Sequence, residues 1–406
     1  MIEETLDLFT APEQQQIQTW ATNCNQIQPP KGLKSIWKTF QKQNPSVTLP
    51  DVERFWRRYH LSKQLDKMAY PLSSKAILFI QQQSMIEEGE SFPQFPYLIT
   101  TLTSLIARQW CIWGIQTYLS LFNGSDATLN TTIVKTLQAP TDNQWWALLT
   151  SGNGILKWLS KQSISSPDHQ TLIDTFQSII KQVPTWNETN ERDANNIQNI
   201  SSKGKAQLIR TIADVVKFLL RYRNALIHAE PLTNQDTANA ALALECWLQA
   251  SLSLNPFVLR SRIGEQVYEL QGMFPTTNNT FLSQLDDTQD RDLVLYHNDT
   301  LLFSLSPLMT LASNIDVIDE AEDIFFINKG SIQSLKYVGF VNGEHKDGQT
   351  LGSYDTFKKY LATIPIPPGG TDNPVIDFRD FAADKSKYFV GRSAVLNEID
   401  QAIASN

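Results

Sequence analysis

The chain has 406 residues and a formal net charge of −8; 41% of its residues are hydrophobic and 19% are charged. This length predicts two or three domains, and the composition is that of a globular protein with enough apolar residues for real cores. The acidic balance argues against a basic surface along the whole chain, but it leaves room for a local basic groove. Three widely spaced cysteines, Cys24, Cys111 and Cys246, imply neither a disulfide framework nor a metal cluster.

The N-terminus is polar and lacks the basic-then-apolar order of a signal peptide. The most apolar stretch, residues 97–122, contains Arg108, Gln109 and Gln116, and these polar residues interrupt it too often for a membrane span. It is therefore predicted to be a buried helix. We expect a cytoplasmic protein that does not contact a membrane.

Apolar residues recur at three- and four-residue spacing from the start of the chain to about residue 254, which predicts helices. We divide this part into an N-terminal helical region, residues 1–90, and a helical bundle, residues 91–255. In the first region, residues 17–24 and 52–59 are amphipathic, with the basic cluster Arg54, Arg57 and Arg58 on the outer face. This cluster either contacts phosphate or belongs to a solvated helix face.

The predicted bundle has residues 97–122 as its central helix, with Asn123-Gly124 as the C-terminal cap. A short helix carries Trp145 and Trp146, which either stack on a base or, for at least one of them, lie in the core. A polar surface loop is expected at residues 186–205. The apolar stripe of residues 208–220 and a last helix at 238–254 complete the bundle.

The composition changes after residue 255, where residues 256–364 predict a small sheet-containing α+β connector domain. Strands are expected at 294–296, 301–305, 323–328 and 335–341, and a helix at 354–361. His297 and His345 fall in predicted turns without metal-spaced partners, so we expect them to be solvated. Residues 365–387 predict a linker and residues 388–406 the start of another unit.

Arg223-Asn224-x-x-x-His228 lies near the end of an apolar helix, and Pro231 predicts that this helix ends close to His228. A five-residue step on a straight helix separates two side chains by about 140°. Arg223 and His228 therefore share a site only if the helix end bends or unwinds. A neutral His228 can take a proton from a ribose 2′-hydroxyl, and a protonated one can donate to the leaving oxygen.

In the same chemistry, Arg223 would hold the non-bridging phosphate oxygens, and Asn224 would orient the phosphate or the imidazole. The motif resembles that of HEPN-type ribonucleases, whose fold is a helical bundle. The resemblance covers roughly residues 90–255. It implies metal-independent RNA cleavage with Arg223, Asn224 and His228 as catalytic positions, in a homodimer or higher homo-oligomer that brings two motifs together. It implies no cofactor for the helical domain.

Residues 388–392, Tyr-Phe-Val-Gly-Arg, resemble the start of the NTPase domain in STAND and related AAA-like proteins. The resemblance implies that Val390, Gly391 and Arg392 contact a nucleotide in a longer chain. The sequence stops at Asn406 before a phosphate-binding glycine loop, so we expect a protein that continues into that domain, which alone would bind ATP.

These observations predict the effector region of a bacterial signalling NTPase in antiviral defence or another conflict system, with a ribonuclease activated by oligomerisation. The alternative is a non-catalytic helical module that dimerises or senses a ligand upstream of the NTPase. An Arg223–His228 cluster open to a cleft favours cleavage, whereas burial of these side chains in packing favours the module.

Overall fold

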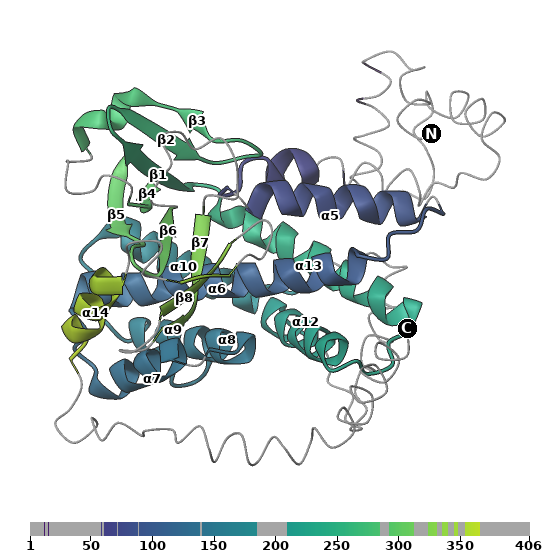
Figure 1. Ribbon diagram of the computed structural model, residues 1–406, viewed down its shortest axis with the longest axis horizontal. Coiled ribbons are helices and arrows are strands. Elements are labelled where there is room, and N and C mark those ends of the chain that lie inside the picture. The colour runs from purple at the N-terminus through teal and green to yellow at the C-terminus, as the bar shows by residue number, and fades with distance from the viewer. Residues whose placement is uncertain are drawn as a thin grey trace, which may run out of the picture.

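The computed structural model describes residues 61–70, 72–87, 89–138, 140–184, 209–284, 292–311, 324–330, 335–339, 345–347 and 354–365, together with Pro12, Gln15 and Arg58. Helices dominate up to residue 254, and two small antiparallel sheets follow (Figure 1). The helical part followed by a sheet-containing part agrees with the predicted fold class. Within these described residues, no helix has the length and apolar character needed to cross a membrane.

The helical part is built around α6 (Phe95–Phe122), which runs through the middle of the molecule (Figure 1). This helix is buried on nearly every face because its only charged residue is Arg108. Its neighbours include α5 (Leu72–Glu87), α8 (Asp142–Thr150), α12 (Ile212–Ile227) and α13 (Asn234–Ser251). It ends at Asn123, whose φ of 47° is tolerated by asparagine, so the predicted C-terminal cap is confirmed.

Shorter helices complete the bundle: α7 (Ala127–Gln138), α9 (Ile155–Leu159) and α10 (Pro167–Lys181). Local sequence fixes where α8 begins, because Thr141 and Gln144 form a capping box that satisfies the first backbone N–H groups. Thr233 and Asp236 do the same for α13. Trp145 and Trp146 on α8 are both buried, whereas burial was expected for at least one of them.

The first sheet has the strand order β3-β2-β1-β4-β5, and every neighbouring pair is antiparallel. Its strands are β1 (Phe257–Ile263), β2 (Gln266–Leu270), β3 (Thr276–Thr277), β4 (Val294–His297) and β5 (Thr300–Ser304). The second sheet has the order β6-β7-β8-β9. Its strands are β6 (Met309–Leu311), β7 (Ile324–Gly330), β8 (Leu335–Gly339) and β9 (His345–Asp347). The helix α14 (Tyr354–Thr363) follows.

The two parts share one hydrophobic cluster, which runs from the bundle into both sheets. Strand β5 lies against α6 and α10, and β7 lies against α7. The guanidinium of Arg108 on α6 also donates to the side-chain oxygen of Asn328 on β7 at 3.3 Å. The sheets are therefore docked on the bundle by both apolar packing and polar contacts.

The expected strands at 294–296, 301–305, 323–328 and 335–341 correspond to β4, β5, β7 and β8. The β1–β2 hairpin was not predicted, although its apolar alternation surrounds a turn at Gly264, whose φ is +59°. His345 lies in β9.

The expectation that His297 is a solvated turn residue is wrong. It ends β4, stacks on Phe257 at 4.6 Å between ring centroids, and its Nδ1 lies 2.5 Å from a carboxylate oxygen of Asp168 on α10. The half-buried imidazole thus joins the first sheet to the bundle.

Arg58 likewise differs from its predicted place on an outer helix face, because it is buried and paired with the buried Glu245 at 3.4 Å. Several other predictions lie outside the described residues: the helices at 17–24 and 52–59 apart from Arg58, the loop at 186–205, the linker from residue 366, and Val390, Gly391 and Arg392.

Candidate functional site

The motif helix α12 ends where the sequence predicts. His228 is its C-terminal cap residue, and Ala229 adopts a left-handed backbone with a φ of 53°. The N–H of Glu230 donates to the carbonyl oxygen of Ala225 at 2.9 Å, the long bond that closes a Schellman end. The imidazole of His228 is exposed at this end of the helix, so it is accessible to a substrate.

Arg223 points to a different place. Its Nε lies 2.9 Å from Oδ2 of Asp142, the first residue of α8. The other oxygen of this carboxylate accepts from Nε of Arg108 at 3.0 Å, and Ser104 donates to Oδ2 at 2.6 Å. Asp142 is 1% exposed in its side chain and Arg223 is 24% exposed. One buried carboxylate therefore holds two arginines from two helices.

Burial of Asp142 by itself would raise the pKa of its carboxyl group. The positive charges of Arg108 and Arg223 and the hydrogen bonds from Ser104 and Arg108 outweigh burial, so its pKa lies below the ordinary value. Asp142 therefore stays ionised at neutral pH. Because one carboxylate faces two guanidinium groups, the cluster keeps a surplus positive charge.

Asn224 connects to the cluster through its side-chain oxygen, which accepts from Nη1 of Arg223 at 3.1 Å. Among the described residues, no hydrogen bond or ion pair joins Arg223 to His228. The helix stays regular as far as Ile227, so the wide separation expected of a straight helix holds within one copy of the chain. The structure brings Arg223 and Asn224 together and leaves His228 apart.

His228 instead shares a face of α12 with other polar residues. Lys217, Arg221, Asn224 and His228 lie at steps of four, three and four residues, which places them within a sector of roughly 60°. We call this set the basic stripe. Its two cations, Lys217 and Arg221, were not predicted as site residues, although their four-residue spacing on the motif's own helix was a usable signal.

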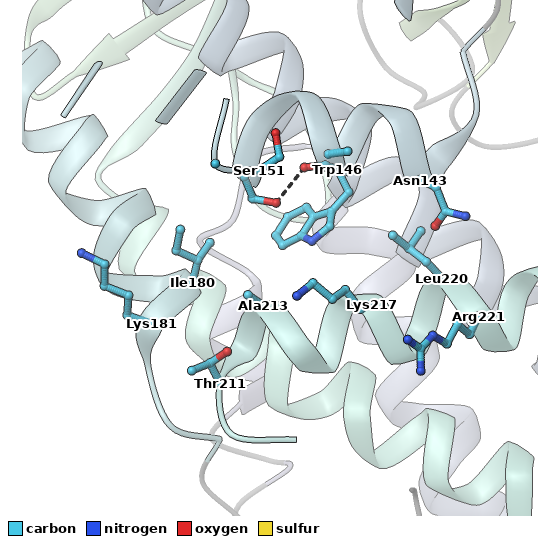
Figure 2. A pocket seen from close by; sticks show the side chains of 13 residues that line it. Asn143, Trp146, Ser151, Ile180, Lys181, Thr211, Ala213, Lys217, Leu220 and Arg221 are labelled. Atoms are coloured by element: carbon cyan, nitrogen blue, oxygen red, sulfur yellow. Dashed lines mark hydrogen bonds between the residues drawn. The ribbon is translucent and has the colours of Figure 1, made fainter. Parts of the chain in front are cut away.

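A pocket opens at the N-terminal half of the basic stripe, between α8, the end of α10 and α12 (Figure 2). Its volume is about 690 Å³. The side chains of Lys181, Lys217 and Arg221 give it positive charge, and Asn143 and Trp146 line it from α8. Asn143 directly follows Asp142, the partner of Arg223. The pocket and the motif's arginine therefore flank the same turn of α8.

Comparison of the whole chain with protein-family models, with curated proteins and with solved structures gave no match.

Proposed function

We propose that the helical bundle is a metal-independent ribonuclease of the HEPN type, and that it is the effector region of a bacterial signalling NTPase in antiviral defence. The observation that carries the proposal is the exposed imidazole of His228 at the end of the basic stripe. Cations beside it on the same helix face supply phosphate contacts, and an imidazole is the side chain suited to move protons at neutral pH.

His228 would take the proton of the ribose 2′-hydroxyl and return one to the leaving oxygen. Arg223 supports the reaction from a fixed direction, because Asp142 and Asn224 restrict its side chain while part of it remains exposed. A guanidinium fixed in advance stabilises the charge of the transition state without a cost of reorganisation at the moment of reaction.

Because Arg223 and His228 point apart in one copy, we propose that the working centre combines residues of two copies. His228 of one chain would then meet Arg223 of the other. Oligomerisation by an ATP-dependent NTPase domain would bring the two motifs together, and the sheet region would transmit the rearrangement. The resemblance of residues 388–392 to the start of such a domain supports this setting.

A second candidate is the non-catalytic helical module, and the Arg223–Asp142 ion pair favours it, because that contact is what a packing role for Arg223 requires. The two functions differ in what they demand of His228. The exposed His228 has no packing role within one chain, and the ribonuclease requires its imidazole for cleavage.

The test compares His228→Ala and Arg223→Ala with the parent chain, in the full-length protein under conditions in which it oligomerises. The readouts are degradation of RNA and stability to urea. The ribonuclease predicts that His228→Ala abolishes degradation and leaves stability unchanged. Unchanged degradation of RNA by both variants would show that the motif has no catalytic role.

A mixture of the two variants tests the shared centre. If each centre combines His228 of one chain with Arg223 of another, mixed oligomers contain some centres in which both residues are intact. We expect mixing to restore part of the activity that neither variant has alone. No recovery in verified mixed oligomers would show that the centre lies within one chain.

A further inference from the structure

The pocket of Figure 2 has the charge and size of a site for a small anion-bearing group. Its volume of about 690 Å³ lies within the usual range of ligand sites. Lys181, Lys217 and Arg221 line it, and none of the lining residues that the structure describes is acidic. Lys217 is half exposed and lies 3.5 Å from Asp214, which is not among the lining residues, so the charged side chains in the described lining are all positive.

Trp146 gives the pocket a buried donor without an acceptor. Its side chain is almost completely buried, and its Nε1 has no hydrogen-bond partner among the described residues. In Figure 2 this nitrogen lies on the edge of the ring that faces Lys217. Contacts with Trp110 and Trp247, at 6.2 and 5.8 Å between ring centroids, fix the ring. This nitrogen has almost no exposed surface, so a ligand oxygen reaches it only after a neighbouring side chain moves; because a buried N–H without a partner is costly, the oxygen then gains a hydrogen bond in addition to charge attraction.

The basic stripe connects the pocket to His228. Lys217 and His228 are eleven residues apart, which corresponds to about 16 Å along a helix axis. A few nucleotides of single-stranded RNA cover such a length, and Arg221 and Asn224 lie between the two ends. A strand that follows the stripe would thus have one phosphate in the pocket and another at His228.

We propose that this pocket is a nucleotide subsite, which binds a phosphate group of the RNA a few nucleotides from the bond that His228 acts on. Lys217, Arg221 and Lys181 supply the charge, and Nε1 of Trp146 donates to a phosphate oxygen. The assignment of this phosphate group to RNA rests on the proposed function. A free mononucleotide carries the same chemistry, so the test includes both.

The test measures binding of a short fluorescein-labelled oligouridylate and, separately, its displacement by AMP or inorganic phosphate. The full chain carries His228→Ala so that the RNA remains intact. We expect the added pair Lys217→Gln and Arg221→Gln to weaken oligonucleotide binding by about tenfold or more. In a plot of the logarithm of the binding constant against the logarithm of the salt concentration, the slope should become shallower by about 0.7 for each phosphate that the variant no longer neutralises. Lys217→Arg should retain binding, because it keeps the charge.

Two matched controls separate the pocket from general effects. Lys157→Gln removes an exposed lysine on α9 outside the pocket and should leave binding unchanged. Trp146→Phe removes the indole donor and should weaken binding by several-fold. Trp145→Phe makes the same change at a buried neighbour whose Nε1 also has no partner in the described part of the chain but which is not among the lining residues, and it should have no effect on affinity.

The outcomes distinguish this proposal from the ribonuclease. If AMP displaces the oligonucleotide and the pocket variants lose AMP binding, the pocket is a nucleotide site even when the parent chain cleaves no RNA. If only the oligonucleotide binds, RNA is the source. The subsite is overturned if the Lys217→Gln, Arg221→Gln variant binds both probes with the affinity of the His228→Ala chain.

Discussion

The guanidinium of Arg223 is paired at 2.9 Å with the carboxylate of Asp142, which is buried at the start of α8. The motif's arginine is therefore part of the packing of three helices, since Arg108 on α6 binds the same carboxylate. Its orientation is set before any substrate arrives. A variant that removes Asp142 affects both the fold and the site, and the two effects can be measured separately.

We expect Asp142→Asn to destabilise the protein by about 3–5 kcal/mol, because it leaves two arginines beside a neutral group in a buried place. Urea unfolding followed by circular dichroism measures this change. Asp174→Asn on α10 is the control, since Asp174 is exposed and its contact with Gln170 lies at the surface. That variant should stay within about 0.5 kcal/mol of the parent. Equal losses from the two variants would contradict the structural role of Asp142.

The lowered pKa of Asp142 makes this contribution depend on pH. A carboxyl group whose pKa is lower in the folded state stabilises the fold fully above its ordinary pKa of about 4. The contribution disappears as the pH falls through the lowered folded value. The difference in stability between the parent and Asp142→Asn should therefore be constant near neutrality and shrink in acid. Urea unfolding of both proteins over this pH range checks it, and a difference that grows in acid would be inconsistent with the ion pairs.

Asp168 and His297 join α10 to β4, and the hydrogen bond with His297 is the main reason why the pKa of Asp168 is lowered. This hydrogen bond also stabilises the fold above the ordinary carboxyl pKa, and its contribution disappears as the pH falls through the lowered value. We expect Asp168→Asn and His297→Gln to be non-additive, with the double variant less destabilised than the sum of the single ones. Urea unfolding of the three variants measures the coupling. Additive effects would show that the hydrogen bond does not couple the sheet to the bundle.

The left-handed residue after His228 offers a stabilising change. Ala229 has a φ of 53°, a conformation that costs alanine about 1 kcal/mol and glycine almost nothing. We expect Ala229→Gly to raise stability by about 0.5–1 kcal/mol, and to leave the proposed RNA cleavage unaffected because His228 keeps its cap position. Thermal unfolding measures the change. A fall in the midpoint would mean that the Schellman end is not populated in solution.

Gly330 at the end of β7 tests how closely α14 covers the second sheet. A Cβ at this position would lie 2.2 Å from Cζ of the buried Phe357. We expect Gly330→Ala to destabilise the protein by about 1–3 kcal/mol, because the ring has to move in a packed core. Gly152→Ala is the control, since nothing lies within 4 Å of the added carbon. Comparable effects of the two substitutions on urea unfolding would contradict the packing of Phe357.

Local patterns predicted much of the fold. The spacing of apolar residues indicated α6, α12 and α13, and Pro231 indicated the end of α12, because a helix must bury one face and proline disfavours helical geometry before it. The β1–β2 hairpin escaped, although Gly264 marks its turn. Its two strands follow α13 closely; the change in composition was placed after residue 255, but strands were predicted only from residue 294 onward.

The contacts of the site could not be predicted in the same way. The partner of Arg223 is Asp142, which lies far away in sequence, and nothing in the local pattern of α8 distinguishes this carboxylate from an ordinary N-terminal acidic residue. The burial of Arg58 against Glu245 could not be predicted for the same reason, because the two residues lie far apart in sequence. Such pairs depend on how helices pack against one another. The periodicity of apolar residues indicates only which face of a helix is buried, and not which residue it meets.

The contact between Arg108 and Asn328 extends the Asp142 cluster from α12 to β7. When two events are coupled through one cluster of residues, the coupling free energy is the same whichever event comes first. A phosphate bound to the exposed part of Arg223 would share the charge of this guanidinium with Asp142, and would so alter the hold of α6 on the sheet. If Arg223 binds phosphate as proposed, a displacement of β7 would by the same linkage change that affinity.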